Sequence, residues 1–179
     1  MTITLIVFAV ALLLAALVLR AARGRAAIVH ELPELEGLTR PVDLVAFRNL
    51  VDPAEEQYLR ANLSRHQFRM IQRQRMRAAL EYVERTNHNG AILLRLGESA
   101  RRDANSEVAA AGRELVSRAL RLRMSALLAT GILYARIAVP EAQISIGYVA
   151  DIYENLANGL VRLTRLQHPT YVTSVSAVI

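Results

Sequence analysis

VAAAGRELVSRALRLRMSALLATGILYARI, residues 108–137, carries the most regular apolar pattern in the chain. Its apolar residues recur at intervals of three or four, which is the spacing of one face of an α-helix. They are Val108, Ala111, Leu115, Ala119, Leu122, Ala126, Ala129, Leu133 and Ile137. The many alanines among them allow close approach of a neighbouring helix. We therefore predict a long helix that begins after the cap-rich corner at 103–106 and ends before Pro140.

One segment of this helix, MSALLATGILYA (residues 124–135), is apolar on nearly every face. Arg123 and Arg136 flank it, and its 12 residues are too few to cross a bilayer, because a transmembrane helix needs about 20. We therefore expect this segment to be buried on all sides, either by the rest of the domain or by another chain.

A second long helix is predicted over residues 65–102. Its apolar and small residues keep one helical phase: Phe68, Ile71, Ala78, Ala79, Tyr82, Leu93, Leu96, Gly97 and Ala100. Asn89-Gly90 is a common turn pair, but the phase continues through it, whereas a turn normally resets the phase. We therefore predict one continuous helix about 57 Å long, at about 1.5 Å per residue.

Local start signals predict two short helices before the long ones. Residues 41–51 form a short, mostly apolar segment. Asp52 followed by Pro53 is typical of a helix start, with an aspartate cap and proline in the first turn. Ser64 and Gln67 have the spacing of a capping box, which predicts the start of the long helix that follows.

The last predicted helix covers residues 147–167 and is stopped by His168-Pro169. Its apolar residues again recur every three or four positions: Val149, Tyr153, Leu156, Leu160 and Leu163. The composition agrees, since hydrophobic residues make up 53% and aromatic residues only 5%, and most of the apolar mass is alanine and aliphatic. The predicted fold class is all-α, an antiparallel helical bundle of three main helices with short N-terminal helices.

The N-terminal stretch Thr2–Leu19 has no charged residue and, as a helix, would extend about 27 Å, close to the thickness of a bilayer core. A buried soluble helix and a cleavable signal peptide are the alternatives, but a signal peptide needs a basic region before its apolar run. Here Arg20, Arg23 and Arg25 come after it. The positive-inside rule then predicts a single-pass anchor in the inner membrane, with the N-terminus outside and the rest cytoplasmic. The predicted organisation is an anchor at 1–22, a juxtamembrane linker at 23–40, the bundle at 41–168 and a tail at 169–179.

Six arginines and no acid lie between Gln57 and Leu80. Arg65, Arg69, Arg73 and Arg77 recur every four residues and form a ridge along one side of the predicted helix, which we call the arginine ridge. It is interpreted first as a solvated face balanced by acids elsewhere, such as Glu55, Glu56, Glu81 and Glu84. The alternatives are binding to anionic lipid headgroups, to an acidic protein or to a nucleic acid. Aromatic residues for base stacking are scarce here, which argues against nucleic acid.

Two further polar residues, Arg75 and Asn89, fall on the predicted buried face of the same helix. A buried guanidinium needs an acid or several carbonyl groups, and a buried amide needs hydrogen-bond partners. We expect both residues to be satisfied within the structure or by a second chain, with a ligand site as the alternative.

The sequence contains no serine nucleophile elbow, Walker loop or glycine-rich dinucleotide fingerprint. The chain has no cysteine, which excludes disulfides, cysteine-ligated metal sites and thiol catalysis. Glu84 and His88 are four residues apart and could share a metal, but the helix at 106–137 offers no histidine to complete a di-metal site. No catalytic, cofactor or metal site is predicted, and the chain is not expected to be an enzyme.

The expected function is therefore that of a membrane-anchored helical scaffold or accessory subunit. Its expected partners are the lipid bilayer and either further copies of itself or other subunits of a membrane complex. The alternative is a module that binds anionic lipid or another polyanion through the arginine ridge.

Overall fold

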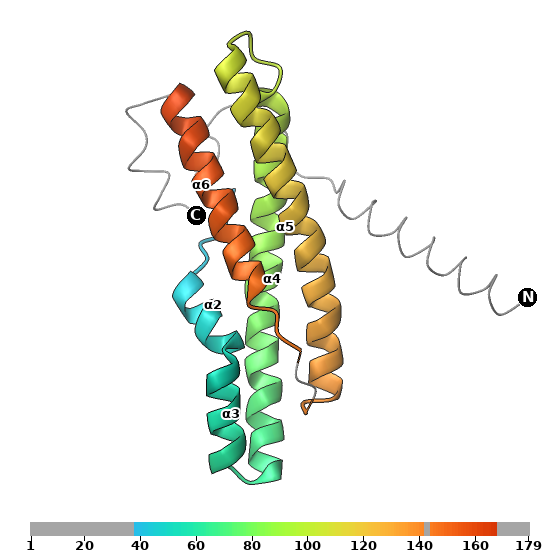
Figure 1. Ribbon diagram of the computed structural model, residues 1–179. Helices are drawn as coiled ribbons and strands as arrows, with labels where there is room; N and C mark the ends of the chain where they lie inside the picture. The colour runs from blue at the N-terminus through green and yellow to red at the C-terminus, as the bar shows by residue number, and fades with distance from the viewer. Residues whose placement is uncertain (1–37, 142–143, 168–179) are drawn as a thin grey trace, which may run out of the picture.

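The computed structural model describes residues 38–141 and 144–167, and these ranges contain only α-helices and their connections (Figure 1). The helices are α2 (Leu44–Val51), α3 (Pro53–Asn62), α4 (Arg65–Ala100), α5 (Ser106–Ala138) and α6 (Tyr148–Gln167). Helices α4 and α5 run antiparallel and make the largest contact, α6 lies along α5, and α2 and α3 lie along α4 (Figure 1). The predicted all-α antiparallel bundle is confirmed for this part of the chain.

The predicted N-terminal anchor and C-terminal tail lie outside the described residues, as does most of the predicted linker. Among the helices that the structure describes, none combines the length and the apolar character needed to cross a membrane.

The helix starts follow the local capping signals. The Asp52 carboxylate accepts a hydrogen bond from the backbone N–H of Ala54 (2.9 Å), and Pro53 opens α3. Ser64 and Gln67 form the predicted capping box at the start of α4. Helix α2 begins at Leu44, three residues later than predicted, because the side chain of Asp43 caps it through the N–H of Ala46.

Helix α4 passes through Asn89-Gly90 without interruption, as predicted. Gly90 lies where α4 meets α5, and a Cβ atom there would be 3.1 Å from Cδ2 of Leu122. The predicted buried face was partly wrong. Gln72, Met76, Val83 and Thr86 are fully buried, whereas Ile71, Ala78 and Tyr82 are half-buried. The reason is that α5 covers one side of α4 and α2 covers the other, where Phe47 stacks on Tyr82.

The apolar stripe of α5 forms the centre of the core. Its predicted members from Val108 to Leu133 are all buried. The last member was predicted wrongly, since Ile137 is only half-buried and Arg136 occupies the buried position instead. In α6 all five predicted apolar residues, from Val149 to Leu163, are buried.

The end of α4 and the start of α5 come into very close contact at Gly112. A Cβ atom there would be 2.5 Å from the backbone nitrogen of Arg101 and 2.8 Å from the carbonyl carbon of Ala100. Only glycine fits at this position without movement of the α4 backbone.

Helix α6 covers only the first part of α5. Arg162 of α6 pairs with Glu114 (2.9 Å), and Gly159 lies against the side chain of Arg118. This antiparallel register brings the start of α6, at Tyr148, level with about Leu128. The rest of α5 extends beyond α6, as Figure 1 shows.

Candidate functional site

The arginine ridge lies on α4 beside the C-terminal end of α5. Arg69 pairs with the Glu141 carboxylate at 2.8 Å, and Arg65 lies 3.6 Å from the same group. Nε of Arg73 donates to the backbone carbonyl of Ile137 at 3.2 Å, in the last turn of α5. Cations are favourable at this end of a helix, where carbonyl groups lack partners within the helix.

The ridge is therefore partly balanced within the fold, although not by the acids named from the sequence. Its acid is Glu141, which follows α5 and is distant from the ridge along the chain. The hydrogen bond from Arg69 lowers the pKa of Glu141, and the charges of Arg69 and Arg65 act in the same direction. Arg77 is exposed and makes no ion pair within the described residues.

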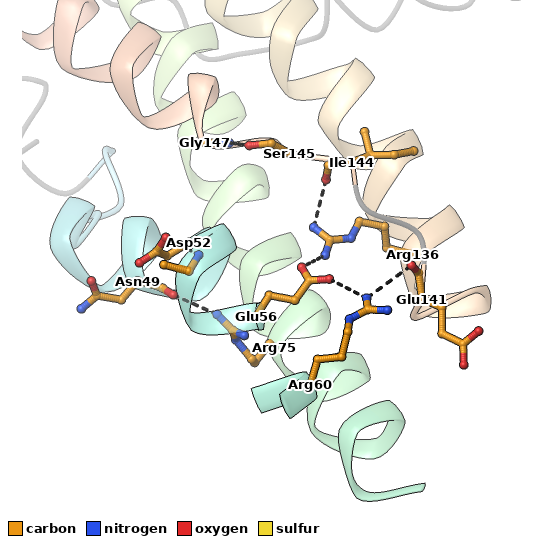
Figure 2. A network of polar contacts seen from close by, with 11 residues as sticks. Asn49, Asp52, Glu56, Arg60, Arg75, Arg136, Glu141, Ile144, Ser145 and Gly147 are labelled. Atoms are coloured by element: carbon orange, nitrogen blue, oxygen red, sulfur yellow. Dashed lines mark hydrogen bonds and ion pairs between the residues drawn. The ribbon is translucent and has the colours of Figure 1, made fainter. Parts of the chain in front are cut away.

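Arg75 lies on the opposite side of α4, facing α2. It is half-buried, and its Nη2 donates to the backbone carbonyl of Asn49 at 3.1 Å (Figure 2). Burial lowers its pKa, against the charges of Glu55 and Glu56. Arg75 also lines an open cleft between α2 and α4, whose walls carry both acids and arginines. This mixed charge gives the cleft no clear preference for an anion or a cation.

Asn89 is fully buried, and both polar atoms of its side chain are hydrogen-bonded. Its Oδ1 accepts from the backbone N–H of Arg40 (2.8 Å), and its Nδ2 donates to the Arg40 carbonyl and to Oη of Tyr153, both at 2.7 Å. Burial raises the pKa of Tyr153 to about 12. The Asn89 side chain thus holds the segment that leads into α2 against α4 and α6. These contacts support the structural interpretation of Asn89.

His88, next to Asn89, also holds the segment that leads into α2. Its Nε2 donates to the backbone carbonyl of Leu38 at 2.9 Å, while Glu84 is exposed. Within residues 38–141 and 144–167, no three histidine or acidic side chains are grouped to hold a metal ion. The geometry therefore gives no support to a shared metal at Glu84 and His88.

A buried ion pair that the sequence analysis missed joins α3 to α5. Glu56 contacts Arg136, whose side chain is only 2% exposed, and Arg60 donates to the other oxygen of Glu56 at 3.2 Å (Figure 2). Arg136 also donates to the carbonyl of Ile144 at 3.0 Å. The available signal was spacing, since Arg136 is three residues after Leu133 on the apolar stripe. The contacts of Glu56 and Arg136 are all with other residues of the bundle, so the pair is a structural link between α3 and α5.

The outer face of α5 exposes large apolar side chains. Leu120 and Met124 are each 42% exposed, Leu128 is 64% exposed and Tyr134 is 58% exposed. Gly131, Ala135 and Ala138 continue this face toward the end of the helix and are also exposed. The prediction that residues 124–135 are buried on all sides by this domain is wrong, because one side of this segment faces away from α4 and α6, and α6 lies beside only its first residues. We give the name α5 outer face to the exposed apolar residues of this region, which are Leu120, Met124, Leu128, Gly131, Tyr134, Ala135 and Ala138.

This apolar face carries no charged residue from Met124 to Ala138, because Arg136 points inward. Contiguous apolar surface of this kind marks interaction sites on soluble domains. No protein-family model matches the chain, and no curated protein or solved structure matches it significantly.

Proposed function

We propose that this protein is a non-enzymatic, membrane-anchored helical scaffold or accessory subunit. In this proposal Thr2–Leu19 spans the inner membrane, and the helical bundle lies on the cytoplasmic side. The bundle assembles with further copies of the chain or with other subunits of a membrane complex. The observation that carries the proposal is the α5 outer face, which is apolar, exposed and uncovered by any other described helix.

The internal contacts of the arginine ridge favour the scaffold proposal over the alternative, in which the ridge binds a polyanion. Arg69 and Arg73 are already bound to Glu141 and to the Ile137 carbonyl. Releasing them to an anionic surface would remove contacts that hold the end of α5. The α5 outer face has no such internal partner. Covering it would lower the free energy by about 25 cal/mol per Å² of apolar area buried.

Fractionation of lysed cells tests the anchor. The intact chain is expected in the membrane pellet, to be released by detergent and not by high salt or carbonate. A variant lacking residues 2–19 is expected in the supernatant. Recovery of the intact chain in the supernatant without detergent would overturn the membrane part of the proposal.

Co-purification tests the assembly. Two differently tagged copies are expressed together, extracted in detergent, and purified through one tag, and all recovered proteins are quantified by mass spectrometry. Leu128→Glu places a charge in the α5 outer face and is expected to deplete whichever chains co-purify. Val45→Glu is the matched control, since Val45 is an exposed apolar residue of α2, 69% exposed. Equal recovery with both variants would contradict assembly through α5.

A further inference from the structure

Helix α3 is held on the bundle mainly by charged side chains. Its one buried residue is Glu56, which contacts Arg136 of α5. Of its large apolar side chains, Tyr58 is 64% exposed and Leu59 is half-buried. Apolar burial is the dominant favourable term in packing, whereas a buried ion pair must first lose its hydration. Helix α3 therefore lacks most of the contribution that holds the other described helices together.

Arg60 makes the second contact between α3 and the bundle. Its guanidinium lies over the ring of Phe68 on α4, 4.7 Å from the ring centroid. The side chain of Arg60 is 36% exposed, so water reaches this contact and weakens it. Phe68 itself is only 4% exposed, which shows that α3 covers an aromatic side chain of α4.

Gln72 of α4 lies beneath α3. Arg60 sits beside Phe68, and the two helices are antiparallel, so Glu56, one turn before Arg60, is level with Gln72, one turn after Phe68. Gln72 is fully buried, yet neither polar atom of its amide has a hydrogen-bond partner within the described residues. A buried amide without partners is unfavourable, and this penalty disappears when water reaches the amide. The closed position of α3 therefore carries a cost that an open position would remove.

The start of α3 is not closely packed against α5. A cavity of about 100 Å³ lies between Pro53 and Glu56 of α3, Arg136 of α5 and Ser145. Nε of Arg136 is buried and has no hydrogen-bond partner among the described residues. Close-packed interiors have few spaces of this size, so the cavity marks a weak contact between α3 and the rest of the bundle.

Short extended links join α3 to its neighbours at both ends. Asp52 alone separates it from α2, and Leu63 and Ser64 separate it from α4. All three residues have extended backbone conformations. Hinges in proteins are a few residues of this kind at the ends of elements. Helix α2, in contrast, is fixed by the fully buried Phe47.

We propose that α3 is a lid that opens while α4, α5 and α6 stay folded. The contact between Glu56 and Arg136 holds the lid closed, and Figure 2 shows Glu56 reaching from α3 to Arg136 on α5. Opening returns both charges to water and exposes Phe68 and Gln72 on α4. Local opening of this kind is expected where few apolar side chains are buried. The lid does not depend on the proposed anchor or assembly.

Thiol labelling tests the lid, because the sequence has no cysteine and one introduced thiol reports on one position. Gln72→Cys is the probe beneath α3, and it removes no hydrogen bond found in the described bundle. Val83→Cys is the matched control, because Val83 is 1% exposed and lies on the same face of α4, about three turns beyond Gln72. In the full-length, detergent-extracted chain, Gln72→Cys should be labelled roughly tenfold faster or more, relative to each thiol in the unfolded chain.

Two substitutions separate opening of the lid from global unfolding. Glu56→Gln weakens a contact that opening breaks, so it should accelerate labelling of Gln72→Cys. Gly112→Ala weakens the contact between α4 and α5, which the open state keeps. It should therefore accelerate labelling of Val83→Cys and leave Gln72→Cys unchanged. The lid is overturned if Gly112→Ala accelerates both thiols equally, or if Glu56→Gln leaves Gln72→Cys unchanged.

Hydrogen exchange of the wild-type chain gives a test that needs no substitution. Backbone amides in the second half of α3 should exchange roughly tenfold faster or more than those in the centre of α6, and their exchange should depend only weakly on urea. A small urea dependence indicates that opening exposes little surface. Equal protection of α3 and α6, with the same urea dependence, would show that α3 opens only when the whole bundle unfolds.

Discussion

Single residues in this bundle take their roles from partners that are distant in sequence. Arg136 is the clearest example, because it occupies a core position of α5 and contacts Glu56 of α3. The sequence pattern favoured Ile137 for that position, because a hydrophobic residue usually fills such a stripe. No local rule identifies Glu56 as the partner, since the two residues are 80 positions apart.

Replacing Arg136 by methionine should lower the free energy of unfolding by about 3 kcal/mol, because Glu56 would stay buried with only Arg60 as its partner. The double variant Glu56→Gln, Arg136→Met should lose clearly less than the sum of the single variants, since neither charge remains. Urea unfolding followed by circular dichroism measures these differences. A loss below about 0.5 kcal/mol for Arg136→Met would show that the pair is not structurally important.

Tyr153 predicts a loss of stability at alkaline pH. Burial raises its pKa in the folded state to about 12, whereas in the unfolded chain the pKa is about 10. The folded state therefore favours the neutral phenol, and this contribution is fully present below pH 10 and is lost as the pH rises toward 12. Ultraviolet titration should show one tyrosine that ionises only at about pH 12, or only on unfolding. Titration of every tyrosine near pH 10 in the folded protein would contradict this.

Asn89 and the arginine ridge show how far the sequence can predict single residues. The phase of α4 correctly placed Asn89 in the core, because phase depends only on spacing within one helix. It did not give its partners, Arg40 and Tyr153, which come from two other segments. Glu141 was missed for the same reason, since it is 72 residues from Arg69.

At the scale of elements, the sequence predicts best what is local. The caps at Asp52 and Ser64 and the continuity of α4 were correct, because each depends on a few neighbouring residues. The prediction of which α4 residues are buried was partly wrong, because the width of the buried face is set by α2 on one side and α5 on the other. The uncovered end of α5 was not predicted either, since it depends on where α6 begins.

The close contact between α4 and α5 gives a matched pair of glycine variants. Gly112→Ala should lower the free energy of unfolding by about 1–3 kcal/mol, because its Cβ would meet α4 backbone 2.5 Å away. Gly131→Ala, on the same helix in open space, should instead raise it by about 0.5–1 kcal/mol through helix propensity. Both are measured by urea unfolding at protein concentrations where the midpoint is constant. Equal effects at the two glycines would contradict the described crossing.

The arginine ridge gives a second matched pair. Arg69→Gln with Arg73→Gln removes the contacts to Glu141 and to the end of α5 and should cost up to about 1 kcal/mol, the usual limit for exposed pairs. The double variant Arg65→Gln, Arg77→Gln should lose less stability. Of these two residues only Arg65 makes an ion pair within the described residues, with Glu141, and its distance of 3.6 Å is longer than that of Arg69. Thermal unfolding compares the two double variants. A larger loss of stability in the second double variant, or a loss of binding to anionic vesicles in it, would contradict a structural role for Arg69 and Arg73 and a solvated role for the rest of the arginine ridge.

At the scale of the whole molecule, the bundle is unevenly covered. Helix α6 lies along the first part of α5, and α2 and α3 lie along α4, so no described helix packs on the outer face of the second half of α5 (Figure 1). The sequence showed that residues 124–135 are apolar on nearly every face, and it left open whether this domain or another chain covers them. The fold shows that the described helices do not, which is the physical basis for proposing an assembly.

We propose that the intact chain assembles through the α5 outer face, and native mass spectrometry of the detergent-extracted protein tests this claim. The wild-type chain, of mass 19.8 kDa, should appear in particles heavier than one copy, either as a multiple of that mass or with additional subunits. Leu128→Glu should shift these particles to the single-chain mass with unchanged helix content, and Val45→Glu should not. A wild-type protein found only at the mass of one chain, extracted from its native membrane, would contradict the claim.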